Sequence, residues 1–139
     1  MHHRIAALAA ATVLLASGAL ATATSASATT DPSGSWDHIW TINNSGLAGE
    51  VWVKEYGDVI EICDMKADGL TPEVTVWALQ SGTYYPKYSL AANGGSGSCV
   101  ERGASDGGNY NLPENTEIQL SLGFSQTATV VPETYFNDH

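Results

Sequence analysis

Carboxylates around a short Cys–Asp segment are the residues of this chain best suited to chemistry. Asp64 and Asp68 lie four positions apart in the stretch CDMKADG, and Asp58 precedes the apolar run before it. Calcium binds about six to eight oxygen ligands from carboxylates and carbonyls, so these three aspartates are the candidate calcium ligands. Lys66, however, stands where the calcium-loop pattern D-x-[DN]-x-[DN]-G needs Asp or Asn. The favoured interpretation is a turn at Asp68–Gly69 with Lys66 as charge partner, and no other cofactor is expected.

Nucleophilic catalysis has little support in the sequence. A Ser–His–acid arrangement needs a histidine near the serine, and after His3 the chain offers only His38 and His139. The run GGSGS at 94–98 fails the nucleophile-elbow pattern G-x-S-x-G, because its last position is Ser98. A flexible loop is therefore the expected structure of this segment, and no catalytic residue is assigned.

A carboxylate-dependent hydrolase is the alternative enzyme class. Glycoside hydrolysis needs two carboxylates about 5–10 Å apart across a cleft. Glu50, Glu55 and Glu61 lie on adjacent candidate strands and are possible members of such a pair. A domain this small has little material for a cleft, so a solvated sheet face is favoured over a catalytic pair, and the protein is not expected to be an enzyme.

Aromatic side chains are the feature most suggestive of ligand binding. The chain contains four Trp and six Tyr against two Phe, and Trp and Tyr combine an apolar ring with a polar group that suits recognition surfaces. The segment YYPKY at 84–88 places aromatic rings on both faces of one expected strand, so one set should face solvent. The candidate binding residues are Tyr84, Tyr85, Tyr88 and Tyr110, for an extracellular carbohydrate or protein. The alternative is that these rings fill the core and pack the sheet edge.

Cys63 and Cys99 are the only cysteines of the chain. An even cysteine count in an exported protein predicts a disulfide, here Cys63–Cys99. A cysteine-ligated metal is disfavoured because the few histidines are scattered along the sequence.

The N-terminal stretch predicts export. His2, His3 and Arg4 precede an uncharged run from Ile5 to Leu20, and Ala26-Ser27-Ala28 has the small residues of an A-x-A cleavage site. The apolar run is short and alanine-rich for a membrane span of about 20 residues. The predicted domains are a signal peptide (1–28), a linker (29–35), a β-domain (36–131) and a tail (132–139), and the mature protein is expected to be secreted without a membrane span.

The charge of the chain excludes one class of partner. Fifteen Asp and Glu face five Lys and Arg, for a net charge of −10. Removing Arg4 with the leader makes the mature protein one unit more acidic. Such a surface repels phosphate backbones, so nucleic-acid binding is not expected.

Turn signals about every ten residues separate seven or eight short apolar segments. The segments VWVKEY and VIEICD, joined at Gly57-Asp58, predict a β-hairpin. EVTVWALQ alternates most clearly and carries apolar groups on both faces, which indicates a central strand. Pro86 cannot donate to a ladder, so its strand is expected at a sheet edge or bulged. The pattern predicts an all-β fold, an antiparallel β-sandwich, with a small barrel as the alternative.

Several segments resemble a group of exported proteins. The N-terminal leader, VIEICDMKADG, the glycine-rich stretch before Cys99, and GGNYNLPEN look like small secreted actinobacterial proteins of unknown function. The resemblance implies a secreted β domain and brings no activity or site residues with it. Together these features predict a non-enzymatic extracellular binding domain. The alternative roles are a small extracellular inhibitor, a cell-surface structural protein, or the hydrolase considered above.

Overall fold

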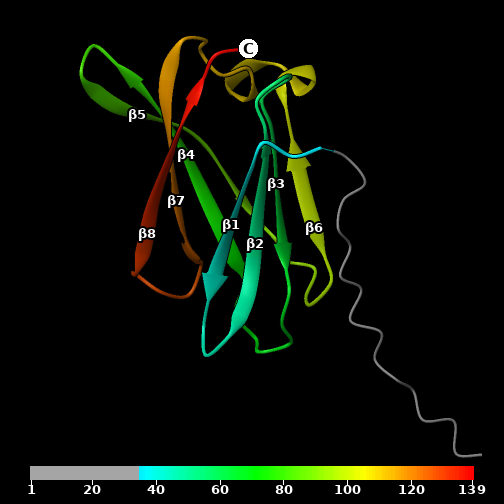
Figure 1. Cartoon of the computed structure of the whole chain (residues 1–139). Coiled ribbons are helices and arrows are strands. Elements are labelled where there is room, and N and C mark those ends of the chain that lie inside the picture. Colours follow the sequence, from blue (N-terminus) through cyan, green and yellow to red (C-terminus); the bar gives the residue numbers. More distant parts are fainter. Residues whose placement is uncertain (1–34) are drawn as a thin grey trace, which may run out of the picture.

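The computed structural model describes residues 35–139, and these residues form eight strands and two short 3-10 turns (Figure 1). The strands are β1 (His38–Asn43), β2 (Leu47–Lys54), β3 (Val59–Asp64), β4 (Pro72–Gln80), β5 (Thr83–Ala91), β6 (Cys99–Arg102), β7 (Thr116–Phe124) and β8 (Val130–Asn137). The 3-10 turns, η1 (Ala104–Asp106) and η2 (Gly108–Tyr110), lie in the loop between β6 and β7. In this part of the chain no helix is long and apolar enough to cross a membrane.

Two antiparallel four-stranded sheets pack face to face. Sheet I has the strand order β1-β2-β3-β6, and sheet II has the order β5-β4-β7-β8. The predicted antiparallel sandwich is therefore confirmed, and it is the sandwich rather than the barrel. β1 and β8 are the edge strands on one side of the sandwich, and β6 and β5 are the edges of the other side.

The core lies between the two sheets, and it is formed by every second residue of the central strands. Sheet I contributes Val51, Val53, Ile60 and Ile62, all fully buried. Sheet II contributes alternate residues of β4 and β7, namely Val74, Val76, Ala78, Ile118, Leu120 and Leu122. Because successive side chains of a strand point to opposite faces, the residues between these positions must face outward.

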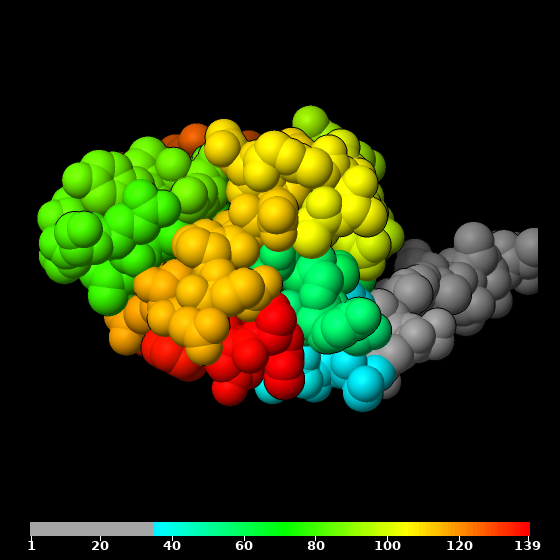
Figure 2. Space-filling view, turned by 90° about the horizontal axis from the view of Figure 1, so that it is seen from above, coloured from blue at the N-terminus to red at the C-terminus, as the bar shows by residue number. Residues whose placement is uncertain are grey.

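Two local predictions are confirmed. β2 and β3 form the expected hairpin around Gly57-Asp58, where both residues have positive φ. β5 is an edge strand, and its pairing with β4 shifts register between Val76 and Trp77, next to Pro86. Figures 1 and 2 both show the tip of the β4–β5 hairpin projecting beyond the body of the sandwich. A bulge and a proline also leave this edge poorly suited to pairing with another strand.

The predicted Cys63–Cys99 disulfide is present. The two cysteines are direct register partners on β3 and β6, so the bond joins neighbouring strands within sheet I rather than the two sheets. It anchors the short edge strand β6, which has only four residues.

The C-terminal boundary differs from the prediction. Residues 132–139 were expected to be a loose tail, but most of them belong to β8, which pairs with β7 along its whole length. Only Asp138 and His139 follow the strand. The reason is visible in the pattern: Tyr135 is buried against the core while its neighbour Phe136 faces out. The predicted signal peptide and most of the predicted linker lie outside the described residues.

Candidate functional site

The outward-facing side chains of sheet II form the candidate binding site. Along β4, Val74, Val76 and Ala78 point into the core, so Trp77 points away from it on the central part of the sheet. The indole Nε1–H of Trp77 donates a hydrogen bond of 3.1 Å to Ser121 Oγ on β7. This bond holds the partly buried ring against the sheet surface.

Strand register brings two more rings to the same surface. Tyr84 on β5 pairs with Leu79 on β4, and Phe136 on β8 pairs with Glu117 on β7. The Tyr84 hydroxyl donates a hydrogen bond to the Glu117 carboxylate, which places these residues in one row across the sheet. Phe136 is 56% exposed.

The next row across sheet II contains Pro86, Trp77, Gln119 and Thr134. We call the surface made by these two rows the aromatic face. Its members are Trp77, Leu79, Tyr84, Pro86, Glu117, Gln119, Thr134 and Phe136.

The aromatic face mixes rings with mostly uncharged polar groups. Gln119 and Thr134 lie between the rings, and Glu117 is the one carboxylate in the two rows. The hydrogen bond to Glu117 raises the pKa of the Tyr84 phenol, so this group stays a neutral donor near pH 7. Farther along the sheet, Thr75 and Ser89 hydrogen-bond to each other at 2.8 Å. A surface of this kind can stack against one face of a ligand ring and hydrogen-bond to its edge.

The four tyrosines predicted from the sequence do not form one patch. Tyr84 lies on the aromatic face, whereas Tyr85 pairs with Ala78 and points to the other side of β5, where it is 50% exposed. Tyr88 points inward and meets Tyr110 of η2 edge-on, with ring centroids 4.7 Å apart. Burial raises the pKa of Tyr88, and its hydroxyl has no hydrogen-bond partner within residues 35–139. Of the four, Tyr84 alone belongs to the candidate face.

Sequence reasoning missed Trp77 and Phe136 as candidate binding residues. The alternation of EVTVWALQ does place Trp77 opposite the core side chains. That pattern was used only to predict a central strand, and β4 does lie between β5 and β7. Phe136 was missed because its segment was assigned to the tail rather than to a strand.

Asp58 is not part of an open ion site. It is 2% exposed, and its Oδ2 accepts a 2.9 Å hydrogen bond from the Leu112 backbone N–H. Its Oδ1 accepts a 3.0 Å hydrogen bond from Asn137 Nδ2, and the same amide nitrogen also donates to the Pro113 carbonyl. Asp58 thus joins the β2–β3 turn of sheet I to the end of β8 in sheet II.

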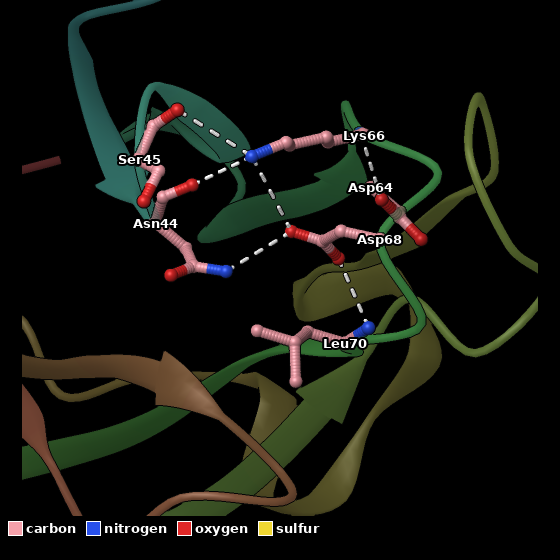
Figure 3. Close-up of polar contacts among 6 residues, drawn as sticks. All are labelled: Asn44, Ser45, Asp64, Lys66, Asp68 and Leu70. Carbon is pink, nitrogen blue, oxygen red and sulfur yellow. Dashed lines mark hydrogen bonds and ion pairs between the residues drawn. The ribbon is translucent and has the colours of Figure 1, made fainter.

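Asp64 and Asp68 lie at the other end of β3, in the loop shown in Figure 3. Asp64 Oδ1 accepts from the Lys66 backbone N–H at 3.0 Å, and Asp68 Oδ1 accepts from the Leu70 backbone N–H at 3.0 Å. These are the local side-chain-to-backbone bonds of two consecutive turns. The Leu70 bond is the main cause that lowers the pKa of Asp68, followed by Asn44 and Lys66.

The Lys66 ammonium occupies the centre of this oxygen cluster. Its Nζ lies 2.7 Å from the Asn44 carbonyl, 3.5 Å from the Ser45 carbonyl and 3.8 Å from Asp68 Oδ2 (Figure 3). The ammonium therefore supplies in this loop the positive charge that a bound cation would supply. The favoured sequence interpretation, a turn with Lys66 as charge partner, matches this geometry.

The structure does not bring the three candidate calcium ligands together. Asp58 precedes β3 and Asp64 ends it, so the six-residue strand separates them by about 20 Å at roughly 3.3 Å per residue. The geometry therefore contradicts a calcium site shared by Asp58, Asp64 and Asp68.

Two of the carboxylates considered for hydrolysis are near neighbours on one sheet face, because Glu61 is two positions from Cys63, the register partner of Glu50, but neither lines the groove between β1 and β8. Glu50 and Glu61 lie on the outer face of sheet I, and Glu55 lies beyond the end of β2. This groove has a volume of 540 Å³ and is lined by side chains that include Ile42, Phe124 and Glu133. Glu133 is the one carboxylate among its lining residues, so this groove lacks the pair of acids that glycoside hydrolysis needs.

Comparison with known proteins adds no assignment. No protein-family model matches the chain, and no curated protein sequence matches it.

Proposed function

We propose that this protein is a secreted, non-enzymatic carbohydrate-binding domain that uses the aromatic face of sheet II. The observation that carries the proposal is the placement of Trp77, Tyr84 and Phe136, from three different strands, on two adjacent rows of one outward surface. A sugar ring has C–H groups on its faces and hydroxyls at its edge. Aromatic faces are electron-rich and attract such C–H groups, while Gln119, Thr134 and the Tyr84–Glu117 pair supply hydrogen bonds.

A neutral glycan is the favoured ligand. The chain carries a net charge of −10, which disfavours anionic polymers at distances where charges are not screened. A protein partner that adds a strand to the sheet is less suited to this structure, because the edge strand β5 contains Pro86 beside a bulge.

Secretion is part of the proposal. The Cys63–Cys99 bond supports an oxidising compartment, since disulfides persist mainly in exported proteins. Cleavage after Ala28 would leave Thr29 as the N-terminal residue, and mass spectrometry of protein from culture supernatant should find it there. Recovery of the protein only from cells, with an intact leader, would argue against export.

The binding proposal is tested with purified protein and soluble neutral probes: a β-glucan, a xylan and chitin oligosaccharides, each with and without calcium. We expect calcium-independent binding to at least one probe. The Phe136→Ala variant should weaken it at least fivefold, because Phe136 is the most exposed aromatic ring of the aromatic face.

Ile39→Ala is the matched control. Ile39 is also 56% exposed but lies on the outer face of sheet I, so binding should be unchanged. Equal loss in both variants, or none in Phe136→Ala, would remove the aromatic face as the site. Absence of binding to every neutral glycan would reject the carbohydrate assignment.

A further inference from the structure

Two histidines that are 101 positions apart in the sequence lie near the same carboxylate, that of Glu55, at one end of the sandwich. His38 begins β1, Glu55 follows the last residue of β2, and Asp138 and His139 follow β8. Within residues 35–139 these are the only two histidines. The sequence alone treats them as scattered, but antiparallel pairing brings the start of β1 beside the end of β2, and Figure 1 shows the end of β8 at the same end of the sandwich.

His38 is held in place before any ligand binds. Its ring stacks on Trp40 with centroids 5.2 Å apart and an interplanar angle of 18°, and it lies 5.1 Å from the Tyr135 ring. His38 Nε2 lies 2.6 Å from Glu55 Oε1. The Glu55 backbone N–H donates to Asp37 Oδ2 at 2.8 Å, which fixes the chain where the carboxylate begins. The imidazole and the carboxylate therefore form a pre-positioned pair.

The segment after β8 adds two more ligand groups. One ligand atom each from Glu55, Asp138 and His139 lies within 4.8 Å of the other two. His139 Nε2 is 3.5 Å from Asp138 Oδ1, and both side chains are more than half exposed. Their exposure leaves them free to adjust around an ion, while the His38–Glu55 pair stays fixed by its packing.

We propose that His38, Glu55, Asp138 and His139 form a binding site for a divalent transition-metal ion of the Zn²⁺ class. Two imidazole nitrogens and two carboxylate oxygens are a donor set that zinc accepts in tetrahedral geometry, at about 2.0–2.2 Å from each atom. Ligand atoms on such a tetrahedron lie about 3.3–3.5 Å apart. The ligand atoms of Glu55, Asp138 and His139 already lie within 4.8 Å of one another, and the exposed Asp138 and His139 side chains would have to move toward His38 to complete the set. Calcium prefers oxygen ligands alone and is the wrong ion for this set.

The bound ion would link the start of β1, the end of β2 and the end of β8. These elements belong to both sheets, on the side where β1 and β8 are the open edges. Asp138 and His139 follow Phe136 of the aromatic face by two and three residues, but none of the four ligands belongs to that face, and the inference does not depend on the proposed glycan binding.

Isothermal titration of the untagged full chain with Zn²⁺, and separately with Ca²⁺, tests the inference. His2 and His3 are replaced by alanine in every sample, because their imidazoles would bind metal on their own. We expect one Zn²⁺ per chain with micromolar affinity and no Ca²⁺ binding. His139→Ala, at an exposed position, and His38→Phe, which keeps a stacking ring, should each weaken Zn²⁺ binding at least tenfold.

Glu133→Gln is the control, since it removes a carboxylate of β8 outside the site and should leave the affinity unchanged. The Co²⁺-loaded protein should show visible absorption bands of four-coordinate geometry that disappear in both histidine variants. No Zn²⁺ binding, or the same affinity in all variants, would overturn the inference. Loss in His38→Phe alone would also overturn it, because the C-terminal ligands would then play no part.

Discussion

The outer faces of the two sheets are built by the same alternation, but they differ in the groups that the register places opposite one another. On sheet I, Glu61 lies directly opposite Glu101, beside the disulfide. On sheet II, the outward-facing positions of the two rows that form the aromatic face hold mainly aromatic rings and neutral polar groups. Like charges on opposed residues destabilise a sheet, whereas aromatic pairs stabilise it. Burial, and then the neighbouring Glu101, raises the pKa of Glu61, so the charged form of this carboxyl is disfavoured on that face.

We infer from this difference a division of roles between the two faces. The acidic face of sheet I favours solubility and is held together by a covalent bond between β3 and β6. Sheet II contains no cysteine, and its outward side chains hydrogen-bond to one another, as Trp77 does to Ser121 and Thr75 to Ser89. We infer that sheet I supplies stability and sheet II supplies recognition.

Removing the disulfide should have the largest effect on stability, and it tests whether sheet I contributes to stability without contributing to glycan binding. Replacing Cys63 and Cys99 by alanine frees a loop with a sequence separation of 36 residues. The chain-entropy estimate for such a loop is about 4 kcal/mol, so the free energy of unfolding should fall by about that amount in urea denaturation. Glycan affinity of the folded fraction should not change. A reduced affinity in a fully folded double variant would show that recognition depends on sheet I.

Asp58 joins the two sheets, and its removal should give the next largest effect. Asp58→Ala removes the acceptor of the Leu112 N–H and one of the two acceptors of the Asn137 amide, which keeps only the Pro113 carbonyl. We expect a loss of about 2–3 kcal/mol, measured by urea denaturation monitored by circular dichroism. Asp58→Asn keeps one acceptor oxygen and should lose less. Equal losses in the two variants would mean that these hydrogen bonds contribute little.

Replacing Glu61 should give the smallest change in the free energy of unfolding, and this change should be an increase rather than a loss. Glu61→Gln removes the charge repulsion with Glu101, so unfolding at pH 7 should cost about 0.2–1 kcal/mol more than in the wild type. Because the folded-state pKa is raised above 4.5, protonated Glu61 favours the native state at low pH. That contribution is lost as pH rises through the folded pKa.

The difference in stability between Glu61→Gln and the wild type should therefore grow as the pH rises above 4.5. Paired denaturation curves from pH 4 to pH 8 measure this difference. A difference independent of pH would show that the carboxylate charge is not the cause.

Much of the fold could be predicted from the sequence, because burial imposes a period of two on each strand. The pattern of EVTVWALQ and TEIQLSLGF defined β4 and β7 closely, and the cysteines had only one pairing. The sequence suggested a short last strand ending at Val131, but the rest of β8 was missed because VVPETYFN contains Pro132 and Glu133 and shows apolar alternation only near its end. Edge strands have one hydrogen-bonded neighbour and tolerate such residues.

The candidate sites were harder to predict, because they depend on register across several strands. Local spacing suggested YYPKY, but Tyr84 and Tyr88 point to opposite faces, because the bulge beside Trp77 shifts the register between them. Trp77 and Phe136 are 59 positions apart and meet only through β7. His38 and His139 are brought to one carboxylate by three strand ends, which no sequence spacing reveals.

The side-chain indole signals of the four tryptophans give the most direct test of the central claim. Each Trp indole N–H has its own resonance in a ¹H–¹⁵N spectrum of the labelled protein. Titration with a glycan that binds should shift the Trp77 resonance and leave that of Trp52, buried in sheet I, unchanged. A bound glycan that shifts other indoles and not Trp77 would contradict recognition by the aromatic face.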